Sequence, residues 1–243
     1  MKNLIISLLL CVPFTGIAQK LFLIEREIST SDVPVTALVM NVTDNFDEVI
    51  DNYKKFVKEE YDLKVKKEDN NMYEVEEVSL PHISVKRGDL RTYLIPTDSM
   101  NLIGIAFILG YDMFLNSTEY PDEMMQLKNL SVAFLEYHYH AYYYDKIESL
   151  NKELKGLIKD LNQNENKISS LKKKVISLDK KASKEDDETK KREIASDKLE
   201  TENEIDIIVS QLPEMRDNLS IKEDEVSILK EELNIYHQQI SLL

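Results

Sequence analysis

Apolar residues recur at alternating steps of three and four positions in two long segments of this chain, from Ile147 to Ala182 and from Ile205 to Leu243. A repeat of about 3.5 residues places a narrow apolar stripe on each helix and is typical of helices that wind around each other. We therefore predict a coiled coil of two arms. The expected seam positions are Ile147, Leu150, Leu154, Leu157, Leu161, Asn164, Ile168, Leu171, Val175, Leu178 and Ala182 in the first arm, and Ile205, Ile208, Leu212, Met215, Leu219, Lys222, Val226, Leu229, Leu233, Tyr236, Ile240 and Leu243 in the second.

The segment between the arms breaks this pattern, because 183–193 places no apolar side chain at a seam position. We interpret it as the tip of an antiparallel hairpin, in which Asp186 or Asp187 caps the returning helix. The pattern does not distinguish arms that pair within one chain from arms that pair between two chains, because each arm is also complementary to itself.

Three residues depart from a regular apolar seam. Asn164 either sets register and oligomeric state by requiring a polar partner, or is a tolerated half-exposed position, which is the interpretation we favour. Lys222 is expected to extend out of the seam towards water. Pro213 removes an amide donor from the second arm, so it predicts a kink or a short break in that helix.

The N-terminus has the pattern of a secretory signal peptide over residues 1–18, with Lys2, an apolar run and the small residues Gly16 and Ala18. We therefore expect an exported bacterial protein, periplasmic or extracellular. The single cysteine, Cys11, lies in this segment. Lipid anchoring through Cys11 is the alternative, although Leu10 is not the small residue that this would favour. No later stretch is long and apolar enough to span a membrane.

Between the signal peptide and the arms, residues 19–140 carry a different pattern that predicts an α+β head. The expected order is strand, helix, a meander of about four strands and a final helix that begins at Pro121. This order predicts an antiparallel sheet with helices on one face, of ferredoxin-like type. The expected domains are thus 1–18, 19–140 and 141–243, with the hairpin tip at about 183–193.

The charge balance and the motifs exclude several functions. A formal net charge of −14 argues against binding to nucleic acid or to anionic membrane surfaces, because both reward clustered lysine and arginine. The chain has no glycine-rich phosphate loop, nucleophile elbow or zinc-binding helix motif. We therefore expect neither an enzyme nor a cofactor.

An aromatic segment, 137–144, contains His138 and His140 where the head should meet the arms. If the second arm folds back, His237 returns to the same level. Three histidines suggest a metal site, but residues two apart on a helix point about 200° apart. We therefore expect no metal and favour an aromatic collar between the head and the arms.

A second candidate site involves His82, Arg91 and Tyr93. Arg91 and Tyr93 alternate on a predicted strand, so they share one face of the sheet. Together with His82 they could line an anion-binding pocket. The interpretation we favour is that all three are ordinary exposed residues.

Several short segments resemble a group of uncharacterised exported proteins of Bacteroidetes that have a small α+β head and a C-terminal coiled coil. The similar segments are Leu63-Lys64-Val65-Lys66-Lys67, Val78-Ser79-Leu80-Pro81-His82-Ile83-Ser84, Phe107-Ile108-Leu109-Gly110 and Tyr120-Pro121. The resemblance implies this architecture and export, but no activity.

The sequence as a whole predicts a non-enzymatic exported protein. In the favoured hypothesis, a coiled-coil stalk presents the head and associates with itself or with another envelope protein. In the alternative, the head binds a small ligand or a metal ion and the stalk only braces it.

Overall fold

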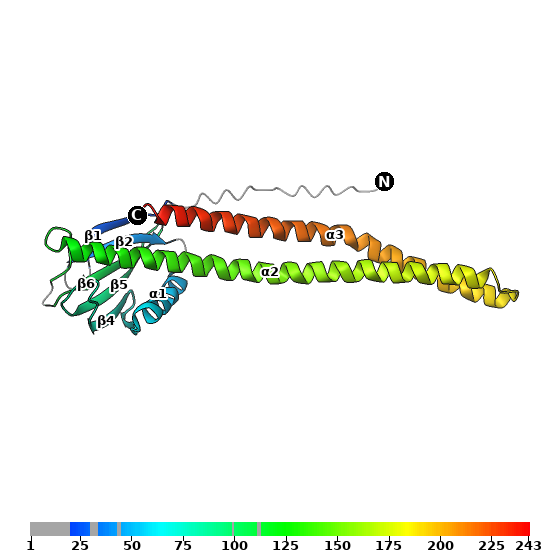
Figure 1. Ribbon diagram of the computed structural model, residues 1–243, viewed down its shortest axis with the longest axis horizontal. Coiled ribbons are helices and arrows are strands. Elements are labelled where there is room, and N and C mark those ends of the chain that lie inside the picture. Colours follow the sequence, from blue (N-terminus) through cyan, green and yellow to red (C-terminus); the bar gives the residue numbers. More distant parts are fainter. Residues whose placement is uncertain (1–19, 30–33, 43–44, 99, 111–112) are drawn as a thin grey trace. The chain divides into compact units, whose positions relative to one another are not determined.

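The computed structural model describes residues 20–29, 34–42, 45–98, 100–110 and 113–243 (Figure 1). The segment predicted to be a signal peptide, with Cys11, lies outside these residues. The chain divides into two compact units. We call Met1–His138 together with Ile235–Leu243 the α+β unit, and Tyr139–Asn234 the hairpin unit. In chain order the elements are β1 (Leu23–Ser29), β2 (Pro34–Val42), α1 (Phe46–Tyr61), β3 (Lys66–Asp69), β4 (Met72–Val78), β5 (Gly88–Pro96), β6 (Asn101–Ile108), α2 (Pro121–Ala182) and α3 (Glu188–Ile240).

The strands of the α+β unit form one six-stranded sheet in the order β1-β2-β6-β5-β4-β3, and every neighbouring pair is antiparallel. The prediction of an α+β fold with an antiparallel sheet is confirmed. The ferredoxin-like type is not confirmed, because that fold runs β-α-β-β-α-β along the chain and this unit begins with two paired strands.

Helix α1 forms where the sequence marks both of its ends. The Asn45 side chain accepts a hydrogen bond from the amide of Glu48 (2.9 Å), which caps the N-terminus of the helix. The helix ends at Asp62, which adopts the left-handed conformation (φ 54°) and whose carboxylate pairs with Lys58. Between these ends, Val49, Ile50, Tyr53, Phe56 and Val57 are buried on one face of α1.

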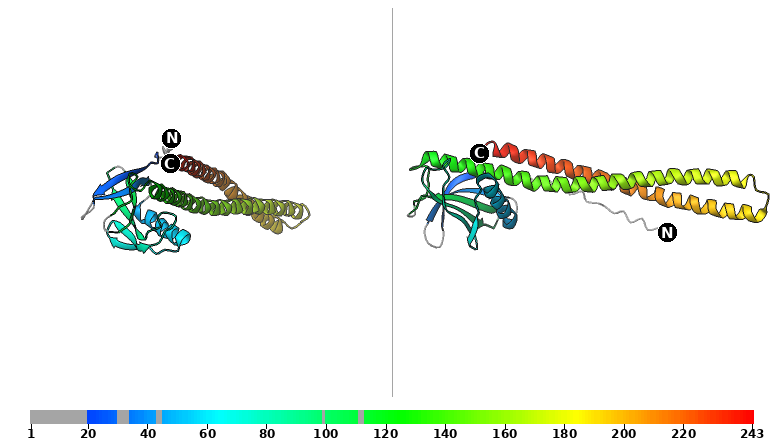
Figure 2. Two further views of the ribbon diagram at one scale, coloured as in Figure 1. Left: turned by 60° about the vertical axis from the view of Figure 1, so that its left-hand side comes forward. Right: turned by 60° about the horizontal axis from the view of Figure 1, so that its bottom comes forward.

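Helix α1 and the first turns of α2 cover the same face of the sheet, which Figure 2 shows in two further views. Tyr53 meets Phe134 of α2 edge-on, with ring centroids 5.1 Å apart. Lys54 places its ammonium group 5.1 Å from the ring centroid of Tyr73 on β4. Leu21 donates its amide hydrogen to Gln239 Oε1 (2.6 Å), which links the segment before β1 to the end of α3 within the α+β unit.

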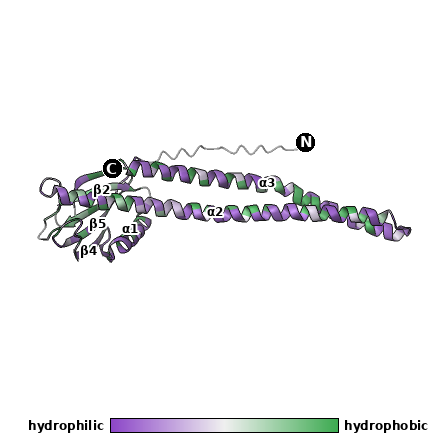
Figure 3. Cartoon of the chain, in the orientation of Figure 1, coloured by the Kyte–Doolittle hydropathy of each residue, from purple (hydrophilic) through white to green (hydrophobic). Residues whose placement is uncertain are grey.

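The hairpin unit contains the parts of α2 and α3 that lie between Tyr139 and Asn234, and these two helices pack together. Ile168 of α2 forms a buried cluster with Ile208 and Leu212 of α3. Figure 3 shows apolar and polar residues alternating along both helices, with an apolar stretch in α3. The helices are joined by 183–187, which is shorter than the predicted tip, and Asp187 accepts from the amide of Thr189 (2.8 Å). The prediction that Asp186 or Asp187 caps the returning helix is therefore confirmed.

Pro213 does not interrupt α3, which is assigned as α-helix from Glu188 to Ile240. The predicted short break is therefore absent. No helix within the described residues contains a window long and apolar enough to cross a membrane.

Two glycines of the sheet provide a test of this packing. A Cβ atom on Gly88 would lie 2.2 Å from the carbonyl oxygen of Ile108 and 2.7 Å from the Phe107 ring. On Gly104 the nearest atom would be 3.5 Å away, an ordinary contact. We expect Gly88→Ala to destabilise the α+β unit by roughly 2 kcal/mol or more, and Gly104→Ala to cost less than about 1 kcal/mol. Scanning calorimetry of the full chain would measure both, and equal effects would contradict this packing.

Candidate functional site

The sheet has a second apolar face, opposite the one covered by α1 and α2. Side chains alternate between the faces of a strand, and the pairing of Ala37 with Arg26 and of Ala106 with Arg91 fixes which residues share this second face. No helical residue belongs to the apolar cluster on it. The buried members of this cluster are Ile28, Val35, Ala37, Val39, Tyr93, Leu102 and Ala106, with Phe22, Met72, Ile95, Met100 and Phe114 packed against them.

A cavity of about 980 Å³ opens on this second face. Its apolar floor comes from five strands and includes Ile28, Val39, Met72, Ile95 and Leu102. The cavity falls at the upper end of the volumes typical of small-molecule sites, which combine apolar walls with a few polar groups. We call this feature the sheet cavity.

Arg91 and Tyr93 share one face, as their alternation on one strand predicts, and both line the sheet cavity. The favoured interpretation that they are ordinary exposed residues is wrong, because Tyr93 is buried and Arg91 is half-buried in the strand pairing of the sheet. Arg91 Nε donates to Glu74 Oε1, and a terminal nitrogen of Arg91 lies 3.7 Å from Asp89 Oδ2. Burial is the largest single effect on Arg91 and lowers its pKa. The hydrogen bond that Arg91 donates to Glu74, the negative charge of Glu74 and the effects of Tyr93 together outweigh burial, so the pKa is raised. Burial also raises the pKa of Tyr93, against the opposing effect of the neighbouring Arg91 charge. The positive charge of Arg91 is therefore already balanced within the protein.

Arg26 is the second guanidinium that lines the sheet cavity. It lies on the edge strand β1 and is exposed. Within the described part of the chain Arg26 forms no ion pair. The neighbouring Glu25 and Glu27 point to the opposite face by strand alternation, and Glu25 accepts from the amide of Ser117 (3.1 Å). Arg26 is therefore available to a negatively charged group in the cavity.

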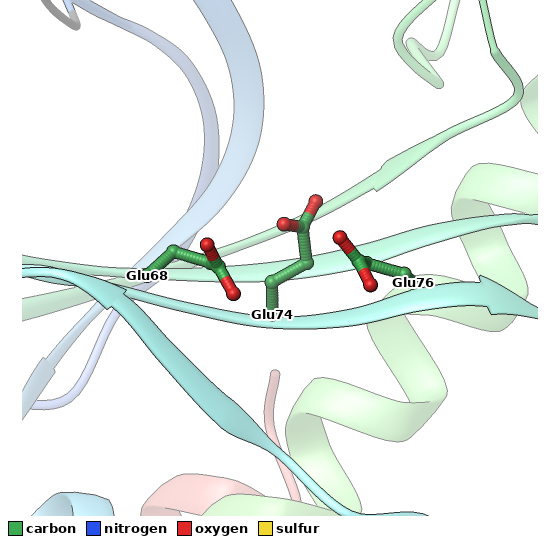
Figure 4. A group of neighbouring side chains, drawn as sticks. All are labelled: Glu68, Glu74 and Glu76. Atoms are coloured by element: carbon green, nitrogen blue, oxygen red, sulfur yellow. The ribbon is translucent and has the colours of Figure 1, made fainter.

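Three carboxylates from β3 and β4 lie side by side near the cavity: Glu68, Glu74 and Glu76 (Figure 4). Their ligand atoms lie within 4.8 Å of one another. However, Glu74 pairs with Arg91, and Glu76 pairs with Lys66 (3.2 Å). Two of the three negative charges are therefore balanced by the protein itself, and the cluster is explained without a cation.

His82 lies away from Arg91 and Tyr93 and does not line the sheet cavity. It sits in the turn after β4 and stacks on Tyr61 at the end of α1, with ring centroids 5.0 Å apart. The prediction that His82, Arg91 and Tyr93 line one pocket is therefore wrong for His82. Its stacking partner, Tyr61, is distant along the chain, so the sequence alone did not reveal this contact.

The other three histidines are in different surroundings. His138 is buried and its Nδ1 lies 3.1 Å from the side-chain nitrogen of Asn52. His140 is exposed and stacks on Tyr144, while His237 is exposed near the end of α3. Among the described residues these histidines do not form a cluster with metal-binding geometry.

The predicted seam residues have partners on the opposite arm. The Asn164 side chain donates to the sulfur of Met215 (3.2 Å), and the half-exposed Lys222 lies 3.5 Å from Glu153 on α2 and 2.8 Å from Glu225. The hydrogen bond to Glu225 raises the pKa of Lys222. Lys222 thus extends to carboxylates beside the seam, in agreement with the prediction.

Sequence reasoning missed Arg26 and Glu74. The alternation of Tyr73-Glu74-Val75-Glu76 does indicate that Glu74 and Glu76 share a face, but the register that joins Glu74 to Arg91 comes from strand pairing. Arg26 joins the site only because β1 and β5 belong to the same curved sheet.

Comparison with known proteins adds no assignment, because no family model, curated protein or solved structure matches this chain.

The ion pair between Glu74 and Arg91 predicts that replacing Arg91 costs more stability than replacing Glu74. The Glu74 side chain is 6% exposed and that of Arg91 is 28% exposed. Arg91→Met should therefore leave a carboxylate buried without its partner and cost about 2–4 kcal/mol. Glu74→Gln keeps a hydrogen-bond acceptor and leaves Arg91 near water and Asp89, so we expect a cost of about 1 kcal/mol. Chemical denaturation followed by circular dichroism would rank the two variants, and the reverse order would contradict the assignment.

Proposed function

We propose that the protein is a non-enzymatic, exported interaction protein, in which α2 and α3 form an antiparallel coiled coil that associates with the hairpin of a second copy. Export rests on the signal-peptide pattern of residues 1–18. The observation that carries the proposal is a set of complementary outer faces on the two arms of the hairpin unit.

The pattern of exposure supports the coiled coil. In the hairpin unit every expected seam position between Ile147 and Leu233 is buried or half-buried. Ion pairs flank the seam on both sides, with Lys167 2.7 Å from Glu204 and Arg216 2.9 Å from Glu165. The apolar seam is thus occupied within one chain, so a second copy has to use another surface.

The outer face of α3 carries such a surface. Ile207, Ile221 and Ile228 share one heptad position outside the seam, and they are 60%, 53% and 47% exposed. The exposed Glu214 occupies the position between Ile207 and Ile221 in this column. Exposed aliphatic residues are common singly, but a column at heptad spacing is a helix-packing surface. Beside it run the exposed acidic residues Asp217 and Asp224. We call this surface the isoleucine column.

The outer face of α2 has the opposite character in both size and charge. In the matching column it carries only small or polar residues, all exposed: Ser149, Gly156, Gln163, Ser170 and Ser177. In the adjacent column it carries exposed lysines: Lys152, Lys159, Lys173 and Lys180. A bulky acidic face on α3 therefore has a small, basic counterpart on α2.

Residues of the two outer faces also lie at matching positions along the length of the hairpin. The contacts Glu153–Lys222, Asn164–Met215 and Asp179–Lys198 show which residues of α2 and α3 lie side by side in one hairpin. Interpolation between them puts Gly156 near the level of Ile221. By the same reasoning, Ser170 lies near the level of Ile207.

A two-fold axis parallel to the hairpin preserves these levels and pairs α3 of one copy with α2 of the other. The same contact then occurs twice, as a closed symmetric dimer requires. Isoleucines meet serine and glycine, while Asp217 and Asp224 approach Lys159 and Lys152. The favourable charge pairs set the orientation, and burial of the isoleucines contributes the affinity.

The isoleucine column provides the main test of the dimer. We expect the mature wild-type protein to be a dimer by light scattering, and Ile221→Asp/Ile228→Asp to be monomeric because each aspartate would be buried against the partner. The control Ser220→Asp/Ser227→Asp adds the same charge to the same helix on a different exposed column and should stay dimeric. A wild-type monomer at every concentration, or equal dissociation of both variants, would contradict the interface.

Gly156 gives a test that separates the dimer from the stability of the hairpin. A Cβ atom on Gly156 has nothing within 4 Å in a single chain. Gly156→Leu should therefore stabilise the hairpin by up to about 1 kcal/mol through its higher helix propensity. In the dimer it would occupy the space next to Ile221, so dissociation should increase. Thermal unfolding and light scattering on one sample would show both effects, and a more stable variant with unchanged dimerisation would rule out this contact.

A further inference from the structure

The curvature of the sheet makes the second face concave. Ile28 on β1 and Ile95 on β5 both reach Gly104 on β6, where an added Cβ would lie 3.6 Å and 3.5 Å from their Cδ1 atoms. β1 and β5 lie on opposite sides of β6 in the sheet. Their side chains converge because Gly104 has none, and the sheet cavity lies beside this contact.

The charged groups around the cavity distinguish between possible ligands. Those that line it are Arg26, Glu27, Asp69 and Arg91. Arg91 is balanced by Glu74 and Asp89, and the Asp69 carboxylate accepts from the amide of Asn70 in its own turn (2.6 Å). The Glu27 side chain is directed to the opposite face by strand alternation. Arg26 is thus the cation that is left for a ligand.

We propose that the sheet cavity binds a small monocarboxylate with an aliphatic body. The aliphatic body lies against Val39, Met72 and Leu102, and the carboxylate pairs with Arg26 at the edge strand. An anionic head suits a guanidinium, whose planar fork can donate two hydrogen bonds to one carboxylate. A ligand with a cationic head would be repelled by Arg26, and an uncharged one would leave this pairing unused. This inference is independent of the proposed dimer, because it uses only the α+β unit.

Straight-chain acids of increasing length are suitable probes. Isothermal titration calorimetry of the full mature protein would compare octanoate, decanoate and dodecanoate, below the concentrations at which they form micelles. Each methylene buried in the cavity should tighten binding by roughly fourfold. The alcohol decanol should bind about tenfold more weakly than decanoate, because it cannot form the charged pair with Arg26.

Substitution of Arg26 tests the assignment of the charged partner. Arg26→Gln should weaken decanoate binding about tenfold and remove the difference between decanoate and decanol. Arg87→Gln is the matched control, because Arg87 is exposed and does not line the cavity, and it should leave both affinities unchanged. If Arg26→Gln bound decanoate as tightly as the wild type, or if the wild type bound none of the acids, the proposal would be overturned.

The methionines report where the probe binds. Met72 lines the cavity, whereas Met125 is 57% exposed on α2 and does not. Decanoate should shift the methyl resonance of Met72 in a carbon-13 spectrum and leave that of Met125 in place. Shifts of both methyls, or of Met125 alone, would indicate non-specific detergent binding and overturn the proposal. Repeating the titration with Ile221→Asp/Ile228→Asp should give the same affinity, so failure of the dimer and failure of the cavity are distinguishable.

Discussion

The hairpin unit depends on the burial of a narrow apolar seam between α2 and α3. A seam of two residues in seven is sufficient only if every other position tolerates water, so the heptad phase decides the role of every residue on both helices. Ile168, Ile208 and Leu212 are buried by that phase, and the same phase leaves Ile207 and Ile221 outside. An aliphatic side chain at an outer position is not buried within one chain, so it adds little to the stability of the hairpin. Its repetition at heptad intervals is therefore the feature of the hairpin that intrachain stability does not explain.

In the α+β unit the corresponding constraint is a sheet that is apolar on both faces. Helices α1 and α2 cover one face, and Tyr53 and Phe134 meet between them. The other face is enclosed mainly by its own curvature and by the edge strand. Because Glu74 is buried there, its carboxylate needs Arg91 as a partner. Arg91 is therefore not available to a ligand, although the sequence made it a candidate for anion binding. Arg26, rather than Arg91, is therefore the guanidinium group that can pair with an anionic ligand.

The sequence predicts features of this protein that depend on local chemistry. The Asn45 and Asp187 caps, the strands of the sheet and the helix beginning at Pro121 all follow from residues within a few positions of one another. It also predicts that Arg91 and Tyr93 share a face, because alternation is local. It does not predict the strand order or the position of His82, because each depends on contacts between distant segments. Pro213 lies inside the continuous helix α3, so the missing amide donor does not produce the short break that was one of its two predicted effects.

The distribution of charge on the hairpin also argues against a purely structural role. Opposite charges on the two arms would stabilise a hairpin most if they lay beside the seam, as Lys167 and Glu204 do. The lysines at 152, 159, 173 and 180 instead lie on the side of α2 opposite the seam, and Asp217 and Asp224 lie on the corresponding side of α3. Exposed ion pairs contribute little to folding, but segregated charges orient an encounter between surfaces. A solvated helix needs charge for solubility, yet solubility does not require that each arm carry mainly one sign on its outer face. Segregation by arm supports the proposed dimer, because it favours α2 against α3 and penalises each helix against its own copy.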